Sequence, residues 1–245
     1  MSGKVKALTI LSVLIVAGFT VFSFAQDEAP QSVVEQGGMG YGMFGTSIID
    51  MSDLNAVLVR NGYSELSDSY FSVGGGGHSI INNKWIIGGE FHSLLGEEVQ
   101  SGEFTTSMYI VHGFASVGYT VFQIQGLRLY PLIGIGGGAM NLTIKEKPAS
   151  LSIDEVLDDP QRGVTLTAGG FLINVAVGAD YFLQFGQDET GRGGMMLGLR
   201  AGYTLSPVKG GWAVDELEVT GAPKMGITGP YIRLMIGGGG FETKK

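Results

Sequence analysis

Apolar residues alternate with small or polar residues along most of the chain, with a period of two. Between positions 165 and 185 the odd residues are largely apolar, whereas the even residues include Asn174, Gly178 and Asp180. Residues 195–205 repeat this alternation. Because neighbouring side chains on a strand point to opposite faces, the pattern predicts strands with one apolar and one polar face, as in a membrane β-barrel.

Eight strands are predicted in this way. They cover residues 39–49, 69–81, 84–96, 103–121, 126–145, 165–185, 193–206 and 228–241. An even number of antiparallel strands is typical of bacterial outer-membrane barrels. The sequence therefore predicts an all-β fold, an eight-stranded antiparallel up-and-down transmembrane β-barrel.

The predicted connections alternate in length. Long connections cover residues 50–68, 146–164 and 207–227. The shortest is Asn82-Asn83, which suits a tight hairpin because asparagine tolerates the positive φ angles of such turns. Short turns on one rim and long loops on the other are expected of an outer-membrane barrel, with the short turns facing the periplasm.

Two of the long loops carry weak helix signals. Ser52-Asp53 is a candidate start for a helical turn that runs through Arg60 and stops at Gly62. Ser152, followed three residues later by Glu155, matches a capping box. We therefore expect a short helix in each of these loops.

The N-terminus predicts export. Lys4 and Lys6 precede an uncharged run, residues 7–25, that ends in Ser23-Phe24-Ala25. This order is typical of a secretory signal peptide cleaved before Gln26. A retained membrane helix is the alternative, because the run approaches a spanning length.

The domain boundaries follow from these segments. We expect residues 1–25 to be the signal peptide, 26–37 a flexible periplasmic lead-in, 38–241 the barrel and 242–245 a C-terminal tail. After residue 25 no stretch approaches the roughly 18 consecutive apolar residues of a membrane helix, so a bilayer must be crossed by a closed barrel. The predicted location is the outer membrane.

Composition supports an exported barrel and excludes several functions. Glycine supplies 42 of the 245 residues, far above the roughly 7% average, but the few prolines fit neither collagen nor a disordered linker. The chain has no cysteine, so no disulfide, thiolate nucleophile or sulfur metal site is expected. Removal of the signal peptide takes away two lysines and no acid, which changes the formal charge from −8 to −10. A nucleic-acid partner is therefore not expected.

This layout resembles the small eight-stranded outer-membrane barrels of the OmpA and OmpX architecture, over nearly the whole mature chain. Members often end on an aromatic residue that the barrel assembly machinery recognises, and the last predicted strand here runs into Phe241. Residues 242–245 extend beyond it, which departs from that rule. The resemblance implies outer-membrane lipid and the assembly machinery as partners; because the family is functionally diverse, it implies no single activity.

Charged and polar residues fall on the predicted lumen face. They form a candidate lumen cluster of Glu90, His92, His112, Arg128, Asp180, Arg200 and Arg233. A barrel of eight strands has an interior just wide enough for side chains to fill, so we expect these charges to be paired. A narrow polar pore or a small ligand site is the alternative. Inward glycines either let the strands bend or make room for the arginines and tyrosines.

Aromatic residues mark the predicted periplasmic rim. They are Trp85, Tyr119, Phe122, Tyr181 and Phe185, all at strand ends. Amphipathic rings gather at the membrane interface. In the last long loop, Trp212 is a candidate anchor for an extracellular or envelope partner, because an exposed tryptophan can bind one. Packing against the rim or insertion into the lipid headgroups is the alternative.

The histidines invite a catalytic interpretation that strand geometry weakens. His92 and Ser93 are neighbours on a strand and point to opposite faces, as do His78 and Ser79, so neither pair can act as a simple dyad. Glu90 shares a face with His92, and an acid–imidazole pair of this kind is more often structural. No catalytic residue is predicted, and the protein is not expected to be an enzyme.

No cofactor or metal is expected either. Glycine runs such as residues 74–77 lack the Lys-Ser or Lys-Thr of a phosphate loop. The acidic loops, with Asp154 and Asp158 in one and Asp215 and Glu218 in another, lack EF-hand spacing and are expected to be solvated.

Three functions remain open at this point. The first is a structural or interaction barrel that acts through its outer loops. The second is a lipid-modifying enzyme, or a narrow pore. The third is a soluble periplasmic barrel that binds an apolar ligand, against which the inward charges Glu90, Asp180 and Arg200 speak.

Overall fold

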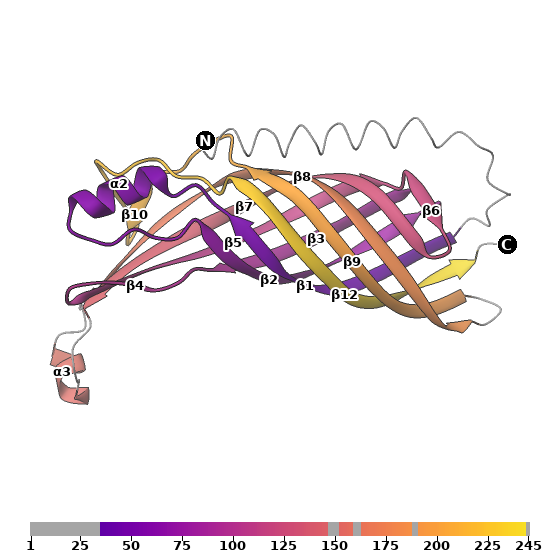
Figure 1. Cartoon of the computed structure of the whole chain (residues 1–245), viewed down its shortest axis with the longest axis horizontal. Coiled ribbons are helices and arrows are strands. Elements are labelled where there is room, and N and C mark those ends of the chain that lie inside the picture. Colours follow the sequence, from indigo (N-terminus) through magenta and orange to yellow (C-terminus); the bar gives the residue numbers. More distant parts are fainter. Residues whose placement is uncertain (1–34, 147–151, 159–162, 188–190, 244–245) are drawn as a thin grey trace.

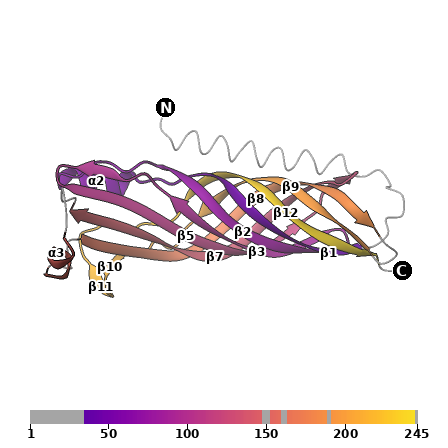
Figure 2. The same ribbon diagram turned by 90° about the horizontal axis from the view of Figure 1, so that it is seen from below.

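A computed structural model describes residues 35–146, 152–158, 163–187 and 191–243 of the chain. Eight long strands form a cylinder in which each strand is tilted to the axis (Figures 1 and 2). They are β1 (Glu35–Ile48), β2 (Ser69–Ile81), β3 (Trp85–Leu95), β5 (Phe104–Tyr119), β7 (Leu127–Glu146), β8 (Gly163–Gln187), β9 (Gly191–Leu205) and β12 (Gly229–Thr243).

The strands close into a ring. Each long strand pairs antiparallel with the next long strand along the chain, and β12 returns to pair with β1. This last pairing runs from Glu35 opposite Thr243 to Ser47 opposite Tyr231. Closure leaves none of the eight strands with an unpaired edge inside a membrane. The predicted eight-stranded antiparallel barrel is therefore confirmed.

The two terminal strands are longer than predicted. β1 begins at Glu35, inside the expected lead-in, and β12 continues to Thr243, inside the expected tail. The two extensions pair with each other, so their backbone groups find hydrogen-bond partners across the two strands. The sequence pattern of either segment alone does not reveal this pairing. The predicted signal peptide and its cleavage site lie outside the described residues.

Both predicted helices are present. α2 covers Ser52–Arg60 and α3 covers Ile153–Asp158. At the start of α2, Oδ1 of Asp50 accepts hydrogen bonds from the backbone N–H of Ser52 (3.1 Å) and from its hydroxyl (2.6 Å). Among the described residues, no helix is long and apolar enough to cross a bilayer.

Four short strands were not predicted, because three residues are too few for a period of two to be recognised. They are β4 (Val99–Ser101), β6 (Phe122–Ile124), β10 (Trp212–Val214) and β11 (Leu217–Val219). β10 and β11 form a small hairpin in the last long loop, which turns at Asp215 and Glu216 with φ angles of 45° and 70°.

One end of the barrel carries the short turns at residues 82–84 and 125–126 and both ends of the described chain; we call it the turn end and the opposite one the loop end (Figure 1). Asn82 and Asn83 adopt φ angles of 53° and 59°, and the N–H of Lys84 donates to the carbonyl of Ile81 (3.1 Å). This is the predicted hairpin turn. Lys84 is exposed beside it.

The two faces of the barrel wall differ as the alternation predicts. Large apolar side chains are exposed on the outside, among them Phe44, Ile48, Phe71, Ile87, Phe91, Ile133, Ile135, Phe171, Val175, Leu199, Ile232, Leu234 and Ile236. The residues between them point inward and are buried. An apolar outside around a polar inside is the arrangement of a barrel in lipid, and the reverse of a soluble carrier.

At the loop end the barrel interior is covered by a cap, which consists of α2 and residues 206–228. Leu54 and Leu58 of α2, with Trp212, Met225 and Ile227, pack onto inward residues of the strands. Those strand residues are Tyr70, Leu94, Met108, Ile110, Phe114, Met140, Leu142, Ala168 and Leu172. Together with the five cap residues and with Ile49, Met51 and Leu66, they make the cap core. The loop end is therefore closed by an apolar core.

Candidate functional site

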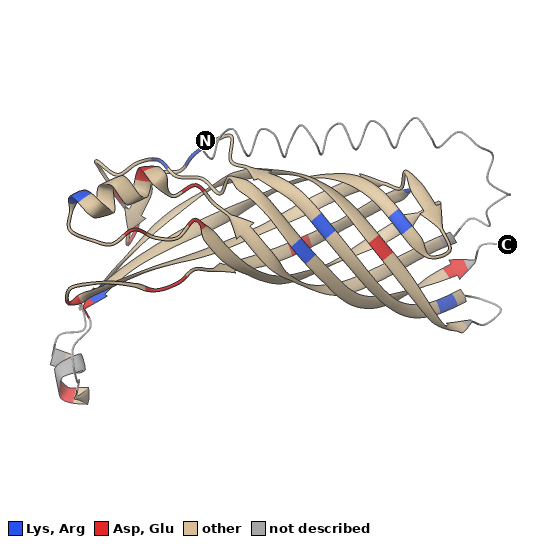
Figure 3. Ribbon diagram, viewed as in Figure 1, with Lys and Arg blue, Asp and Glu red and all other residues tan. Residues whose placement is uncertain are grey.

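A charged layer fills the middle of the barrel, where blue and red segments lie on neighbouring strands in Figure 3. Its centre is Glu90 on β3. The Arg200 guanidinium donates to Oε2 of Glu90, and Nη1 of Arg233 lies 3.8 Å from Oε1. Nε2 of His92 is 3.5 Å from the same Oε1. One buried carboxylate is thus shared by two arginines and a histidine.

A second carboxylate is linked to the first through a tyrosine. Nη2 of Arg200 donates to the hydroxyl of Tyr130 (3.2 Å), and this hydroxyl donates to Oδ1 of Asp180 (2.8 Å). Nε2 of His78 lies 4.0 Å from Oδ2 of Asp180, and Nδ1 of His78 is 3.4 Å from the hydroxyl of Tyr41. The network therefore runs across the lumen between strands that are not neighbours in the ring.

Arg233 connects the layer to the cap side. Its Nε donates to Oγ of Ser72 (3.1 Å), and its Nη2 lies 3.2 Å from Nε2 of His112. The guanidinium also stacks on Tyr231, with 3.9 Å between Cζ and the ring centroid. The hydroxyl of Tyr231 in turn donates to Asn174 (2.9 Å). Each of these side chains is buried.

The turn end is closed by aromatic rings and arginines. Phe241 faces the lumen and meets Phe182 edge to face, at 5.1 Å between ring centroids. Arg128 and Arg192 lie on the Phe241 ring, with Cζ 5.0 and 4.9 Å from its centroid. Arg128 is also the direct cross-strand neighbour of Asp180. Phe241 therefore plugs the barrel, and its recognition by the assembly machinery stays a prediction.

Inward glycines make room for the large side chains of the layer. Glu90 is paired across strands with Gly76, His92 with Gly74, His112 with Gly138, and both Tyr130 and Arg200 with Gly178. A Cβ atom at Gly178 would overlap the Tyr130 ring, and one at Gly76 would lie 3.0 Å from Cβ of Glu90. This decides between the two explanations of the inward glycines, because the volume that glycine omits is occupied by its neighbour.

One internal cavity lies within the charged layer. A cavity of about 10 Å³ lies beside Glu90, Arg200 and His78, and Tyr41 and Ser116 also line it. This volume holds about one water molecule. The hydroxyl of Ser116 and Nε2 of His78 have no hydrogen-bond partner here, so a single bound water would satisfy them. A cavity of this size is not a channel.

All seven residues of the predicted lumen cluster are buried inside the barrel. Six of them make the centre of the charged layer, and Arg128 lies between Asp180 and the Phe241 plug. Sequence reasoning did not select Tyr41 and Tyr130, although both join the network. Tyr130 is two residues from Arg128 on β7 and therefore shares its inward face, which is the signal that identifies it.

The predicted rim aromatics lie together at the turn end. Trp85 and Tyr119 are cross-strand neighbours whose rings meet edge to face at 5.2 Å. Trp85, Phe122, Tyr181 and Phe185 are exposed on the outside of the barrel. Their position is that of an interfacial girdle.

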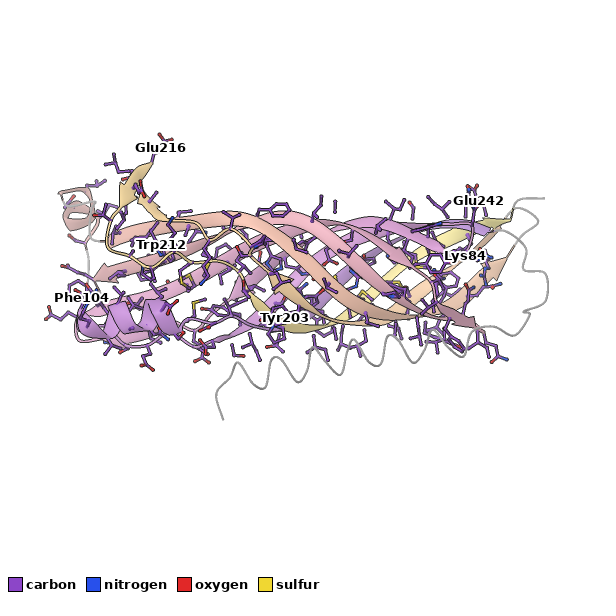
Figure 4. All side chains as sticks on the ribbon, turned by 90° about the horizontal axis from the view of Figure 1, so that it is seen from above. Lys84, Phe104, Tyr203, Trp212, Glu216 and Glu242 are labelled. Atoms are coloured by element: carbon purple, nitrogen blue, oxygen red, sulfur yellow. The ribbon has the colours of Figure 1, made fainter. Side chains whose placement is uncertain are left out.

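Trp212 is not the exposed anchor that we expected. Only 1% of its surface is accessible, and its Nε1–H donates to the carbonyl of Pro223 (3.0 Å). Figure 4 shows it between the strands and the rest of the last loop. Trp212 holds the cap together because the cap folds into a core of its own, which the sequence pattern of a loop does not reveal.

The arrangement offers no reactive dyad among the described residues. Ser93 lies on the outside of the barrel, where its hydroxyl accepts a hydrogen bond from Tyr109 (2.9 Å), while His92 is fully buried inside. Ser79 is exposed on the outside and His78 is buried. The described residues also contain no group of three or more His, Asp or Glu side chains that could hold a metal ion.

The chain is similar to several solved structures. One is the attachment invasion locus protein Ail of Yersinia pestis, with 12% identity over 86% of this chain and 99% of that chain, and a TM-score of 0.39. Others are the outer membrane protein OprG of Pseudomonas aeruginosa (10%, over 89% and 98%, TM-score 0.30) and the outer membrane protease OmpT of Escherichia coli (9%, over 90% and 100%, TM-score 0.29). The sequence matches no family model and no curated protein.

Proposed function

We propose that this protein is an outer-membrane β-barrel with a structural or interaction role, which it performs through the cap and loops at its loop end. The observation that carries the proposal is the combination of a lipid-type outer face with an interior that is packed along its length. Such a barrel anchors a folded surface in the membrane. In this proposal the loop end faces outward and the turn end faces the periplasm.

The surface that the loop end offers is acidic (Figure 3). The exposed acids of the described loops and strand ends are Asp50, Asp53, Glu65, Asp68, Glu97, Glu98, Glu103, Glu146, Asp154, Asp215, Glu216 and Glu218, against the basic residues Arg60, Lys145, Lys209 and Lys224. Electrostatic complementarity favours partners with a basic surface and disfavours anionic ones. We therefore expect the partner to be a basic protein surface.

The enzyme and pore alternatives have less support. A lipid-modifying enzyme needs an imidazole that substrate can reach, whereas His92 and His112 are buried beneath the cap. A pore needs a continuous path, whereas the cap core, the charged layer and the Phe241 plug follow one another along the lumen. The packing thus favours a non-enzymatic role and a closed lumen.

Heat-modifiable migration tests the membrane assignment. Inner and outer membranes are separated, and the detergent-extracted protein is run on a denaturing gel with and without boiling. We expect a mobility shift in the outer-membrane fraction, because a closed barrel resists the detergent until it is boiled. A soluble protein without a shift contradicts the assignment and favours the periplasmic carrier.

Photo-cross-linking in living cells tests the interaction role. A photoreactive residue replaces Glu216 at the tip of the β10–β11 hairpin, and the matched control replaces Phe171 on the lipid face. We expect a discrete cross-linked protein at position 216 and none at position 171. A barrel that is present in the outer membrane but gives no cross-link at position 216 contradicts the interaction role and leaves the location intact.

A further inference from the structure

A pair of histidines lies at the boundary between the charged layer and the cap core. On β3 the next inward residue after His92, toward the loop end, is Leu94; on β5 the corresponding neighbour of His112 is Ile110. Both Leu94 and Ile110 belong to the cap core. The two imidazole rings lie 5.3 Å apart.

The cap rests directly on this pair. Gly138 is the cross-strand partner of His112 on β7, and Ile227 of the cap fills the space above it. A Cβ atom at Gly138 would lie 2.6 Å from Cδ1 of Ile227 and 2.8 Å from Cβ of His112. The Ile227 side chain therefore separates the imidazole from the solvent at the loop end.

The surroundings of His112 are suited to a neutral ring and not to a charged one. Nη2 of Arg233 donates toward Nε2 of His112 at 3.2 Å, so this nitrogen must be the acceptor and carry no proton. The other ionisable groups that act on His112 are His92 and Glu90 of β3. On β7 the residue opposite His112 is Gly138, which has no charge. On β1 and β2 the hydrogen-bond partners of Arg233 are Ser47 and Ser72, which are also uncharged.

A second proton on His112 would place two positive charges side by side among buried side chains. Glu90 cannot offset the new charge, because Arg200, Arg233 and His92 already share it. The layer as a whole has three arginines against the two carboxylates of Glu90 and Asp180. An imidazolium in this position is stable only when water reaches it.

Water can reach His112 from the loop end only if the cap moves. The barrel wall is a closed ladder of backbone hydrogen bonds, and Arg233 is held by Ser72, Glu90 and Tyr231. The cap over Gly138 is held by the side-chain packing of Ile227 and its neighbours in the cap core. The cap is thus the part that can move away from His112.

We infer that the cap is an acid-sensitive latch: protonation of His112 beside Arg233 releases residues 206–228 from the loop end while the eight-stranded barrel stays closed. Release exposes the apolar residues of the cap core, including Trp212, to the medium. The loop end therefore presents a different surface in acid than at neutral pH. This inference concerns the cap alone and does not rest on the proposed interaction role.

Tryptophan fluorescence tests the latch. The chain has two tryptophans, so Trp85→Phe leaves Trp212 as the only reporter. Trp212 emission and its quenching by acrylamide are followed in detergent micelles from pH 8 to about 5, the range in which imidazole gains a proton. We expect weak quenching at pH 8 and a severalfold rise in the quenching constant in acid, while unboiled samples keep the mobility of a closed barrel.

Two variants in this background locate the effect. His112→Gln should keep Trp212 buried throughout, because a glutamine oxygen still accepts the Arg233 hydrogen bond but takes up no proton. The control His78→Gln should open like the parent, since His78 lies beside Asp180 and is not part of the cap core. A parent that keeps Trp212 buried at pH 5 overturns the latch whatever the variants do, and so does a folded His112→Gln variant that opens like the parent.

Discussion

At the scale of the residue, the interior is built from pairs of a large side chain and a glycine. Tyr130 and Arg200 flank Gly178, and His112 faces Gly138. On the outside, by contrast, a Cβ atom added to Gly40 would have no heavy atom within 4 Å. Volume therefore requires glycine at Gly178 and Gly138, but not at Gly40.

Alanine at these two kinds of glycine should have opposite consequences. Gly178→Ala drives a methyl group into the buried Tyr130 ring, so we expect a loss of about 1–3 kcal/mol in the free energy of unfolding. Gly40→Ala should stay within about 0.5 kcal/mol of the parent. Urea unfolding of the protein in lipid vesicles measures both, and equal losses would contradict the volume argument.

Among the charged residues, substitution of Glu90 should lower the free energy of unfolding most. Glu90→Gln leaves Arg200 and Arg233 without a shared carboxylate, and breaking a buried pair costs about 3–5 kcal/mol. Glu98→Gln removes an exposed pair with Lys145 (3.3 Å), for which about 1 kcal/mol or less is expected. The same urea titration compares them. If the Glu90 variant is no less stable than the Glu98 variant, the ion pairs of Glu90 with Arg200 and Arg233 do not stabilise the charged layer.

At the scale of the element, the cap behaves as a small folded unit attached to the barrel. The β10–β11 hairpin is anchored by Trp212, and Gly210 and Met225 exchange backbone hydrogen bonds of 2.9 and 3.0 Å. Asn55 joins α2 to the segment that follows it. Its side-chain amide donates to the carbonyl of Leu66 and accepts from the N–H of Leu66, each at 2.9 Å. These contacts hold residues 49–68 and 206–228 together at the barrel mouth.

Trp212→Ala should loosen the cap and leave the barrel intact. Truncation of a buried tryptophan costs about 3–5 kcal/mol, and here the loss falls on the cap. We expect faster proteolysis within residues 206–228, with an unchanged heat-modifiable core. Leu217→Ser, at an exposed position on the same hairpin, is the control and should be cleaved like the parent. Loss of the barrel itself in the Trp212 variant would mean that cap and barrel are one cooperative unit.

At the scale of the whole molecule, the barrel is asymmetric along its axis. The rim aromatics and the Phe241 plug lie at the turn end, whereas the cap and most exposed acids lie at the loop end. Figure 4 shows Lys84 and Glu242 at one end and Glu216 and Phe104 at the other. This polarity makes the orientation in the membrane measurable.

Single cysteines should report that orientation without background, because the chain has none of its own. Glu216→Cys should react with a membrane-impermeant maleimide on intact cells. Lys84→Cys should react only after the outer membrane has been opened, since the turn end is expected to face the periplasm. The reverse labelling pattern would invert the proposed topology.

The sequence by itself determined the strand number, most strand boundaries and the inward or outward direction of most side chains. These properties depend on a period of two and on local turn chemistry, as at Asn82-Asn83, and both are properties of neighbouring residues. Seven of the charged and histidine residues of the lumen were found for the same reason. The period-two pattern does not specify which side chain each inward residue contacts across the lumen.

Only the tertiary structure decided which side chains meet. Glu90 and Arg200 are 110 residues apart, and they meet because ring closure sets β3 and β9 across the lumen from each other. The burial of Trp212 and the inward plug formed by Phe241 have the same origin. Each depends on how the closed ring staggers its strands and on how the loops fold back over its mouth, and no local pattern encodes either.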